Sequence, residues 1–296
     1  KSGLKAGRDF YLAYSYERLM PGCLLDYIIN LPRTVGGVNK KSCDKAVKMY
    51  KKIVKAKILH TDILTAETSK TIENAYRDVN IAFANETAIV CESLGINVYE
   101  VRELINSRAE RHMHVPGIGV GGHCLPKDTW LLNYGLKKYG KSPINPEFVQ
   151  LARKINDYMP IHATEMIREA LASKKIALRD AKIVLLGVAY LEDSDDVRNT
   201  PAYDLIRELE AYGAEVVAHD PHVRTFPEVE LSRDLDHVLK GADCIVICTR
   251  HKPYFKLRLK KVKSLVRTPI IVDGRNVFSR AKAEEAGFVY KGIGKG

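Results

Sequence analysis

Short apolar runs alternate with amphipathic stretches from about residue 182 onward. The apolar residues of these runs are continuous rather than alternating, which is typical of parallel strands buried on both faces. The predicted strands are Lys182–Val188, Ala214–His219, Asp243–Cys248 and Pro269–Asp273. The predicted helices between them are Pro201–Tyr212, which Gly213 closes, and Asp234–Leu239. The alternation predicts a parallel sheet with helices on both faces, which we assign to a domain of residues 176–296.

Residues 63–175 follow a helical period instead. A long helix is predicted over Ala66–Leu94, where Gly95 ends it, with apolar residues repeating along one face. That face consists of Ile72, Ala75, Tyr76, Val79 and Phe83. Further helices are predicted over about Val98–Arg108, from Pro126 to Gly140, and from about Pro146 to Ser173. We therefore expect an all-α central domain.

Residues 1–62 contain too few predicted strands to close a sheet. The pattern gives a strand at Asp9–Tyr14, a turn at Pro21-Gly22, an apolar stretch ending at Gly36-Gly37, a basic helix from about Ser42 and a strand at Ala56–His60. This segment is typical of the C-terminal part of an α/β domain. Because the chain opens with Lys1 and enters a strand almost at once, we expect that it is processed or belongs to a longer polypeptide.

The composition is that of a globular chain. Hydrophobic residues make up 46% and charged residues 28% of its 296 residues. No stretch of about 18 apolar residues could span a membrane, and no basic-then-apolar leader opens the sequence. The cysteines show no disulfide spacing, so we expect reduced thiols and a cytoplasmic protein without a membrane partner. The six are Cys23, Cys43, Cys91, Cys124, Cys244 and Cys248.

Lys and Arg exceed Asp and Glu by 47 − 36 = 11, and two runs concentrate this positive charge, within residues 40–57 and 250–267. Such surfaces attract anions, either phosphorylated metabolites or nucleic acid. Two solvated helix faces are the plainer interpretation. The sequence contains no helix-turn-helix, RNP motif or paired zinc finger, so we expect no nucleic-acid partner.

A G-x-G-x-x-G pattern occurs at Gly117, Gly119 and Gly122, but no buried strand precedes it and no helix opens on its last glycine. We therefore do not interpret it as a dinucleotide fingerprint. The glycines instead bring the backbone close to another group just before Cys124. That thiol precedes Pro126 near a predicted helix N-terminus, where the helix dipole and neighbouring cations favour a nucleophilic thiolate.

Several side chains surround this cysteine in the sequence. Lys127 is one of the neighbouring cations, and Asp128 lies about one helical turn from the thiol. A metal site would draw on His112, His114, His123 and Cys124. Their spacing is not a zinc pattern, so we assign no metal.

On the long helix, Lys70, Asn74 and Arg77 share one face, opposite the apolar one. An ordinary solvent-facing stripe is one interpretation of these residues. The other is a site for an anionic, hydroxyl-rich ligand, held by an ammonium, an amide and a guanidinium.

These segments together resemble the UDP-glucose/GDP-mannose dehydrogenase family. Gly119–Asp128 resembles the active-site signature of that family, and Glu67–Glu86 resembles its central helix. The remaining matches are Asp9–Arg18 with Pro21-Gly22, Ser194–Pro201, Thr249–His251 and Asp273–Asn276. The resemblance covers nearly the whole chain in order. It implies an α/β protein with the remnant of an N-terminal Rossmann domain, a central all-α dimerisation domain and a C-terminal Rossmann-like UDP-binding domain.

The resemblance also implies an activity, namely the twofold NAD-dependent oxidation of the C6 alcohol of a UDP-sugar to the carboxylate. UDP-N-acetyl-D-mannosamine is the favoured substrate, with UDP-N-acetylglucosamine and UDP-glucose as alternatives. A second hypothesis is a non-catalytic UDP-sugar-binding module, because the family's N-terminal dinucleotide fingerprint is not found in this sequence. We expect a homodimer formed through the central helices, or a higher oligomer.

Residue roles follow from the resemblance by position. The implied catalytic residues are Cys124, Lys70, Asn74, Asp128 and Glu17. The implied substrate-binding residues are Arg18, Leu19, Arg77, Arg108, Gly121, Tyr190, Leu191 and Arg275, where Arg108 reaches the substrate of the partner subunit. Arg198 and Lys127 are the implied cofactor-binding residues. The sequence departs from many relatives at Tyr16, where they have Pro, and at Leu191, where they have Lys.

Overall fold

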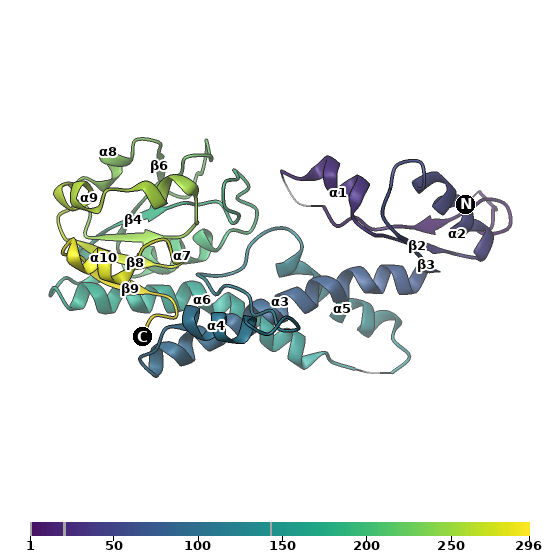
Figure 1. The fold of residues 1–296 in the computed structure, drawn as a ribbon, viewed down its shortest axis with the longest axis horizontal. Coiled ribbons are helices and arrows are strands. Elements are labelled where there is room, and N and C mark those ends of the chain that lie inside the picture. Colours follow the sequence, from purple (N-terminus) through teal and green to yellow (C-terminus); the bar gives the residue numbers. More distant parts are fainter. Residues whose placement is uncertain (1, 20–21, 143) are drawn as a thin grey trace. The chain divides into compact units, whose positions relative to one another are not determined.

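The computed structural model describes residues 2–19, 22–142 and 144–296, so that Lys1 and Pro21 lie outside it. The chain divides into two compact units (Figure 1). The first comprises Lys1–Ala75 and Leu131–Ile144, and the second comprises Tyr76–Trp130 and Asn145–Gly296.

A three-stranded sheet of order β1-β2-β3 forms the first unit together with two helices. Its elements are β1 (Ala13–Tyr14), α1 (Leu24–Asn30), β2 (Arg33–Gly37), α2 (Lys40–Tyr50) and β3 (Ile58–Asp62). β1 is antiparallel to β2, whereas β2 and β3 are parallel. Val35 of β2 packs against Val47 of α2. The strand predicted over Asp9–Tyr14 pairs with β2 only over its last two residues, because the Gly7 N–H closes a turn onto the Phe10 carbonyl.

Four helices follow this sheet in the sequence. They are α3 (Ile63–Ser93), α4 (Val98–Asn106), α5 (Leu125–Tyr139) and α6 (Glu147–Ala172). Each agrees within a few residues with a helix predicted from the pattern. Gly95 ends α3 with a φ of 71°, the left-handed conformation that glycine adopts without strain. No helix among the described residues is long and apolar enough to cross a membrane.

The buried side of α3 combines alanines with polar residues, which the sequence pattern does not indicate. Asp78 and Asn85 are fully buried, and both contact α6. Tyr76 and Phe83 of the predicted apolar face are instead 70% and 58% exposed. The helix therefore packs through small apolar residues and a hydrogen-bonded polar network, while Tyr76 and Phe83 lie on the surface of the chain.

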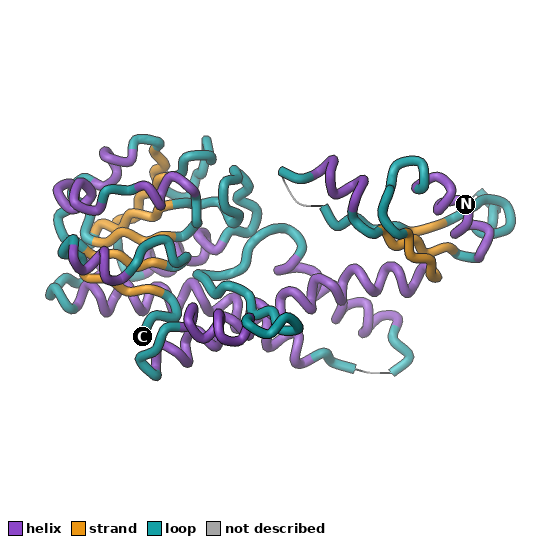
Figure 2. Tube along the Cα trace, viewed as in Figure 1, coloured by secondary structure: helices purple, strands orange, loops and turns teal. Residues whose placement is uncertain are grey.

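A six-stranded sheet dominates the second unit (Figure 2). The strands are β4 (Lys182–Leu186), β5 (Glu215–His219), β6 (Glu230–Ser232), β7 (Cys244–Ile247), β8 (Ile270–Asp273) and β9 (Val289–Gly292). They are all parallel and lie in the order β6-β5-β4-β7-β8-β9. Counted from β4, this is the order 3-2-1-4-5-6 of a Rossmann fold, whose ligands bind where the order reverses, here between β4 and β7.

Helices cover both faces of this sheet. The further helices are η1 (Leu178–Asp180), α7 (Pro201–Ala211), α8 (Leu235–Leu239), η2 (Lys252–Lys256), α9 (Leu259–Leu265) and α10 (Arg280–Glu285). Ile183 and Leu185 of β4 belong to the core on the α6–α7 face, and Val184 and Leu186 belong to the core under α8, α9 and α10. The alternation of side chains along β4 therefore fills two separate cores.

Candidate functional site

The first unit brings together the predicted residues that lie around the start of α3. The Lys70 ammonium donates to the Glu17 carbonyl at 2.9 Å and lies 3.8 Å from its carboxylate. Its Nζ also lies 5.8 Å from the centre of the Tyr16 ring. Lys70 retains 19% of its side-chain exposure, so it is held in place but still accessible to a ligand. Asn74, one turn along the same helix, is buried.

Arg18 is anchored within the protein. Its Nε pairs with the Glu73 carboxylate at 3.0 Å, and its Nη2 donates to the Tyr16 hydroxyl at 2.9 Å. The neighbouring Glu17 carboxylate accepts the Leu19 N–H. The segment that precedes α1 is therefore attached to α3 by two cations, Lys70 and Arg18.

The second unit contains the glycine loop, which we define as residues 115–123. Its glycines allow another part of the chain, the loop that contains Tyr190, to approach closely. A Cβ on Gly121 would lie 2.5 Å from the Tyr190 Cβ, and one on Gly122 would meet the Tyr190 ring at 3.0 Å. Backbone bonds fix the contact, because the Gly122 N–H donates to the Arg198 carbonyl at 2.9 Å.

Cys124 is the residue before α5, and its carbonyl accepts hydrogen bonds from the N–H groups of Lys127 and Asp128. The thiol is half-buried, while Cys43, Cys91, Cys244 and Cys248 are buried. Asp128 is 5% exposed, and its carboxylate lies 3.3 Å from the Lys127 ammonium. The structure thus places a partly accessible thiol, a buried carboxylate and an ammonium in the first turn of one helix.

The predicted arginines differ in what they contact. Arg275 donates to the Cys248 carbonyl at 2.9 Å and to the Gly119 carbonyl at 3.2 Å, so it joins the end of β7 to the glycine loop. Arg198 holds both carboxylate oxygens of Asp196.

Two further arginines lie at the surface. Arg108 pairs with Glu110 at 3.0 Å, and Arg77 is exposed near His114. Burial lowers the pKa of His114, and the charges of His112 and Arg77 lower it further.

A buried polar cluster at the carboxyl ends of β5 and β7 was not assigned from the sequence. Asp220 is fully buried after β5, and its carboxylate accepts the N–H groups of Val188, Ala189, His222 and Val223. Burial alone would raise its pKa, but these bonds and one from His251 hold it well below the usual range. A polar residue directly after a buried strand is the signal that could have indicated this cluster.

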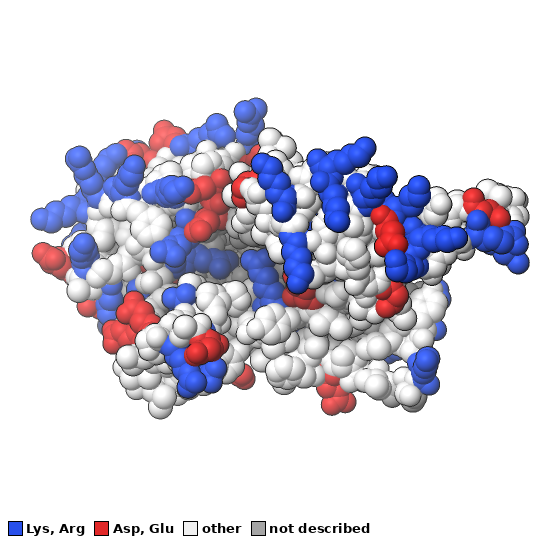
Figure 3. Space-filling model, turned by 45° about the vertical axis from the view of Figure 1, so that its right-hand side comes forward, with Lys and Arg blue, Asp and Glu red and all other residues white. Residues whose placement is uncertain are grey.

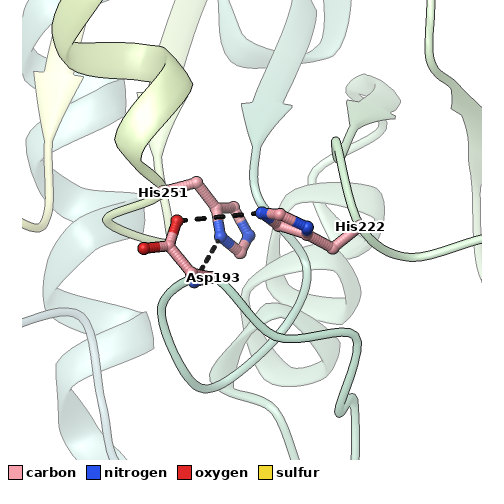
Figure 4. Close-up of side chains that lie close together, drawn as sticks. All are labelled: Asp193, His222 and His251. Carbon is pink, nitrogen blue, oxygen red and sulfur yellow. Dashed lines mark hydrogen bonds and ion pairs between the residues drawn. The ribbon is translucent and has the colours of Figure 1, made fainter. Parts of the chain in front are cut away.

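Asp193, His222 and His251 offer ligand atoms within 4.8 Å of one another (Figure 4). The hydrogen bonds argue against a metal site here. The Asp193 N–H donates to Nδ1 of His251, so Nε2 carries the proton that it shares with Asp220. The Asp193 carboxylate is already paired with Lys252 at 2.9 Å.

The two basic runs lie on α2 and around α9. Lys and Arg side chains are spread over the face drawn in Figure 3, with Asp and Glu among them. Ion pairs neutralise part of both runs, such as Lys40 with Asp44 at 3.0 Å and Lys261 with Asp236 at 2.5 Å. These contacts favour solvated helix faces.

Comparisons with known proteins identify the family to which this architecture belongs. The model of the central domain of the UDP-glucose/GDP-mannose dehydrogenase family matches residues 64–158, and the model of its UDP binding domain matches residues 184–280. UDP-N-acetyl-D-mannosamine dehydrogenase of Pyrococcus horikoshii is 40% identical over 296 residues, which are 100% of this chain and 67% of the relative. The Methanocaldococcus jannaschii enzyme of the same name is 37% identical, with 99% of this chain and 66% of the relative covered.

Solved structures agree. The UDP-D-ManNAc dehydrogenase of Pyrococcus horikoshii superposes with a TM-score of 0.91 at 40% identity, covering 99% of this chain and 67% of that one. NDP-N-acetyl-D-galactosaminuronic acid dehydrogenase of Methanosarcina mazei Go1 gives 0.93 at 40% identity, covering 99% and 64%. The chain thus spans about two thirds of the length of the relatives it matches.

The combination of a helical region, with a cysteine-bearing loop between α4 and α5, and a following parallel sheet of Rossmann order is that of the nucleotide-sugar dehydrogenase class. The chain belongs to the UDP-glucose/GDP-mannose dehydrogenase family. The family and the α/β fold class predicted from the sequence are confirmed, as is membership of a family of oxidoreductases.

Proposed function

We propose that the protein oxidises the C6 alcohol of a UDP-sugar twice, to the carboxylate, with UDP-N-acetyl-D-mannosamine as its substrate. The observation that carries the proposal is the thiol of Cys124, which is half-buried beside Asp128 at the start of α5. The names of the relatives support the choice of sugar. UDP-N-acetylglucosamine and UDP-glucose are the alternative substrates.

Cys124 attacks the C6 aldehyde in this proposal, giving a thiohemiacetal that retains the reactive intermediate. Oxidation of the thiohemiacetal gives a thioester, and water opens it to the carboxylate. Lys70 protonates or stabilises the oxygen on C6 as charge develops there, with Asn74 beside it. Asp128 supports the proton transfers, and Glu17 assists the attack of water.

When bound, NAD would supply the hydride acceptor for the two oxidation steps. The six-stranded sheet does not fit a dinucleotide. The glycine of its first turn, Gly187, allows the close approach of Thr249 and not of a pyrophosphate, because a Cβ on Gly187 would lie 2.4 Å from the Thr249 Cβ. Asp220, which stands where such folds bind a ribose, is bonded to backbone N–H groups instead. Among the described residues, we assign only Arg198 and Lys127 to the edge of an NAD site.

We also propose a homodimer formed through the central helices. The exposed stripe of α3 supports it, because Tyr76, Phe83 and Val90 recur at helical spacing and are 70%, 58% and 51% exposed. On α6, Phe148 and Leu151 are 69% and 55% exposed. Water contact with this much apolar surface is unfavourable, and a second copy of the same helices would remove it.

Formation of NADH by the chain, given NAD and UDP-N-acetyl-D-mannosamine, tests the activity. We expect two NADH per sugar, and a Cys124→Ser variant should stop at the aldehyde or lose turnover. An unchanged rate of acid formation in that variant would exclude the covalent role of Cys124. Saturable UDP-sugar binding without NADH would favour the non-catalytic binding module.

A further inference from the structure

The loop that follows β4 is fixed at its first end by one carboxylate. We define the 188–193 loop as residues 188–193, which include Tyr190 and Leu191. The Oδ2 atom of Asp220 accepts the Val188 N–H at 2.8 Å and the Ala189 N–H at 3.3 Å. The first two residues of the loop are therefore held to the end of β5.

His251 holds the other end of the same loop. Its Nδ1 accepts the Asp193 N–H at 2.9 Å (Figure 4). Its Nε2 lies 3.1 Å from Oδ2 of Asp220. The His251 ring is fully buried, so both bonds lie away from water. Asp193 has a φ of 53°, a conformation that costs free energy for a residue other than glycine and persists where contacts impose it.

The loop contacts the glycine loop between these two anchors. Tyr190 packs against Gly121 and Gly122, where any side chain on either glycine would clash with it. The loop also begins at the reversal of strand order, which is where ligands bind in such sheets. A displacement of the loop would therefore reach both the ligand crevice and the segment before Cys124.

We propose that Asp220 and His251 are positioning residues that hold the 188–193 loop in the shape that binds the nucleoside diphosphate end of the substrate. Neither residue needs to touch the ligand. One ring makes both bonds, because Nδ1 of His251 accepts from Asp193 while Nε2 donates to Asp220, and the bond to Asp193 is the one that holds the loop. The identity of the ligand rests on the function proposed above, whereas the loop restraint does not.

Two substitutions separate the two bonds of His251. In His251→Gln the amide N–H can still reach Asp220, but no acceptor remains at the position of Nδ1. In His251→Asn the side-chain oxygen can still accept the Asp193 N–H, while the bond to Asp220 is lost. The matched control is His219→Phe, which removes the bond to Tyr254 in the same buried cluster and leaves the loop untouched.

Amide hydrogen exchange of the full chain without ligand is the first measurement. We expect the peptide that contains Asp193 to exchange about tenfold faster in His251→Gln, as for one lost buried hydrogen bond, and at near the wild-type rate in His251→Asn. Wild-type exchange in His251→Gln would overturn the proposal. Equal loosening in His219→Phe would also overturn it, because the cluster would then be merely structural.

Titration with UDP is the second measurement. We expect the dissociation constant to rise about tenfold in His251→Gln and to stay near the wild-type value in His251→Asn and His219→Phe. If the dissociation constant for UDP were unchanged in a variant whose loop amides exchange faster, the proposed role of His251 in ligand binding would be wrong. Failure of the wild-type chain to bind UDP would count against the proposed function, and hydrogen exchange would still decide the restraint.

Discussion

Arg153 of α6 and Asp78 of α3 form a fully buried ion pair, with 2.8 Å between Nη1 and Oδ1. The same carboxylate oxygen accepts from Asn156, whose own amide oxygen accepts from Asn85 at 2.8 Å. Asn85 in turn accepts the Gly117 N–H at 2.9 Å. A line of buried hydrogen bonds therefore connects the packing of two helices to the glycine loop before Cys124.

Removing one partner of this ion pair should lower the free energy of unfolding far more than removing both. Arg153→Met leaves the Asp78 carboxylate buried without its cation, and we expect a loss of about 3–5 kcal/mol in the free energy of unfolding. In the double variant Arg153→Met with Asp78→Leu, no charge stays buried, so most of that loss should be recovered. Urea unfolding of the wild type and the two variants measures this, and a double variant no more stable than Arg153→Met would contradict the expectation.

The glycine loop should not tolerate a single methyl group at its contact with Tyr190. Gly121→Ala would place a Cβ 2.5 Å from the Tyr190 Cβ, so the loop must move, at a cost of about 1–3 kcal/mol. We expect Cys124 to become more reactive towards iodoacetamide, measured by peptide mass spectrometry with the exposed Cys23 as internal reference.

Gly135→Ala is the matched control, because a Cβ there meets nothing within 4 Å inside a helix. That variant should be more stable than the wild type by about 0.5–1 kcal/mol, with unchanged Cys124 reactivity. Equal Cys124 reactivity in both glycine variants would show that the contact with Tyr190 does not set the position of the thiol.

The sequence predicts the sheet and most helices because hydrophobic burial determines them. The continuous apolar run over Lys182–Val188 contains the central strand β4, and the turn residues Gly95 and Gly213 end helices with φ values of 71° and 84°. The elements that were missed are short or polar. The edge strand β6 has three residues and no buried one, and α9 and α10 each bury a single residue.

The site was predicted less completely, for a physical reason. Cys124 and Lys70 were proposed from the sequence because they lie in motifs that resemble those of a known family. Asp220 and Asp78 were missed, because the groups that stabilise a buried carboxylate are distant from it along the chain. His251 lies 31 residues from Asp220, so the bond between them cannot be inferred from spacing alone.

Stability of the sheet should fall below neutral pH because of His219. Burial lowers the pKa of this histidine below its usual 6.5, despite the opposing charge of Asp220. The unfolded chain therefore binds more protons than the folded one below about pH 6.5, so stability present above that pH is lost as the pH falls. Asp220 has a lowered pKa and contributes a separate loss only below about pH 4.

His219→Phe isolates this contribution. The change in urea midpoint between about pH 7.5 and about pH 5.5 should be smaller in the variant than in the wild type. His114, whose pKa burial also lowers, contributes a loss of the same sign in both proteins, and Asp78, whose pKa burial raises to about 6, opposes it in both. An identical pH dependence in the two proteins would exclude His219 as a source.

The exposed stripe of α3 makes a sharp prediction about assembly. In a symmetric dimer, Phe83→Glu would place a charge from each subunit in an apolar interface. We therefore expect this substitution to shift the chain from dimer to monomer. Light scattering after gel filtration measures the mass. Tyr212→Glu is the control, because Tyr212 is also 50% exposed but follows α7 and is not part of the stripe on α3. A chain that is monomeric before substitution, or a Phe83→Glu variant that remains dimeric, would show that this stripe does not form the interface.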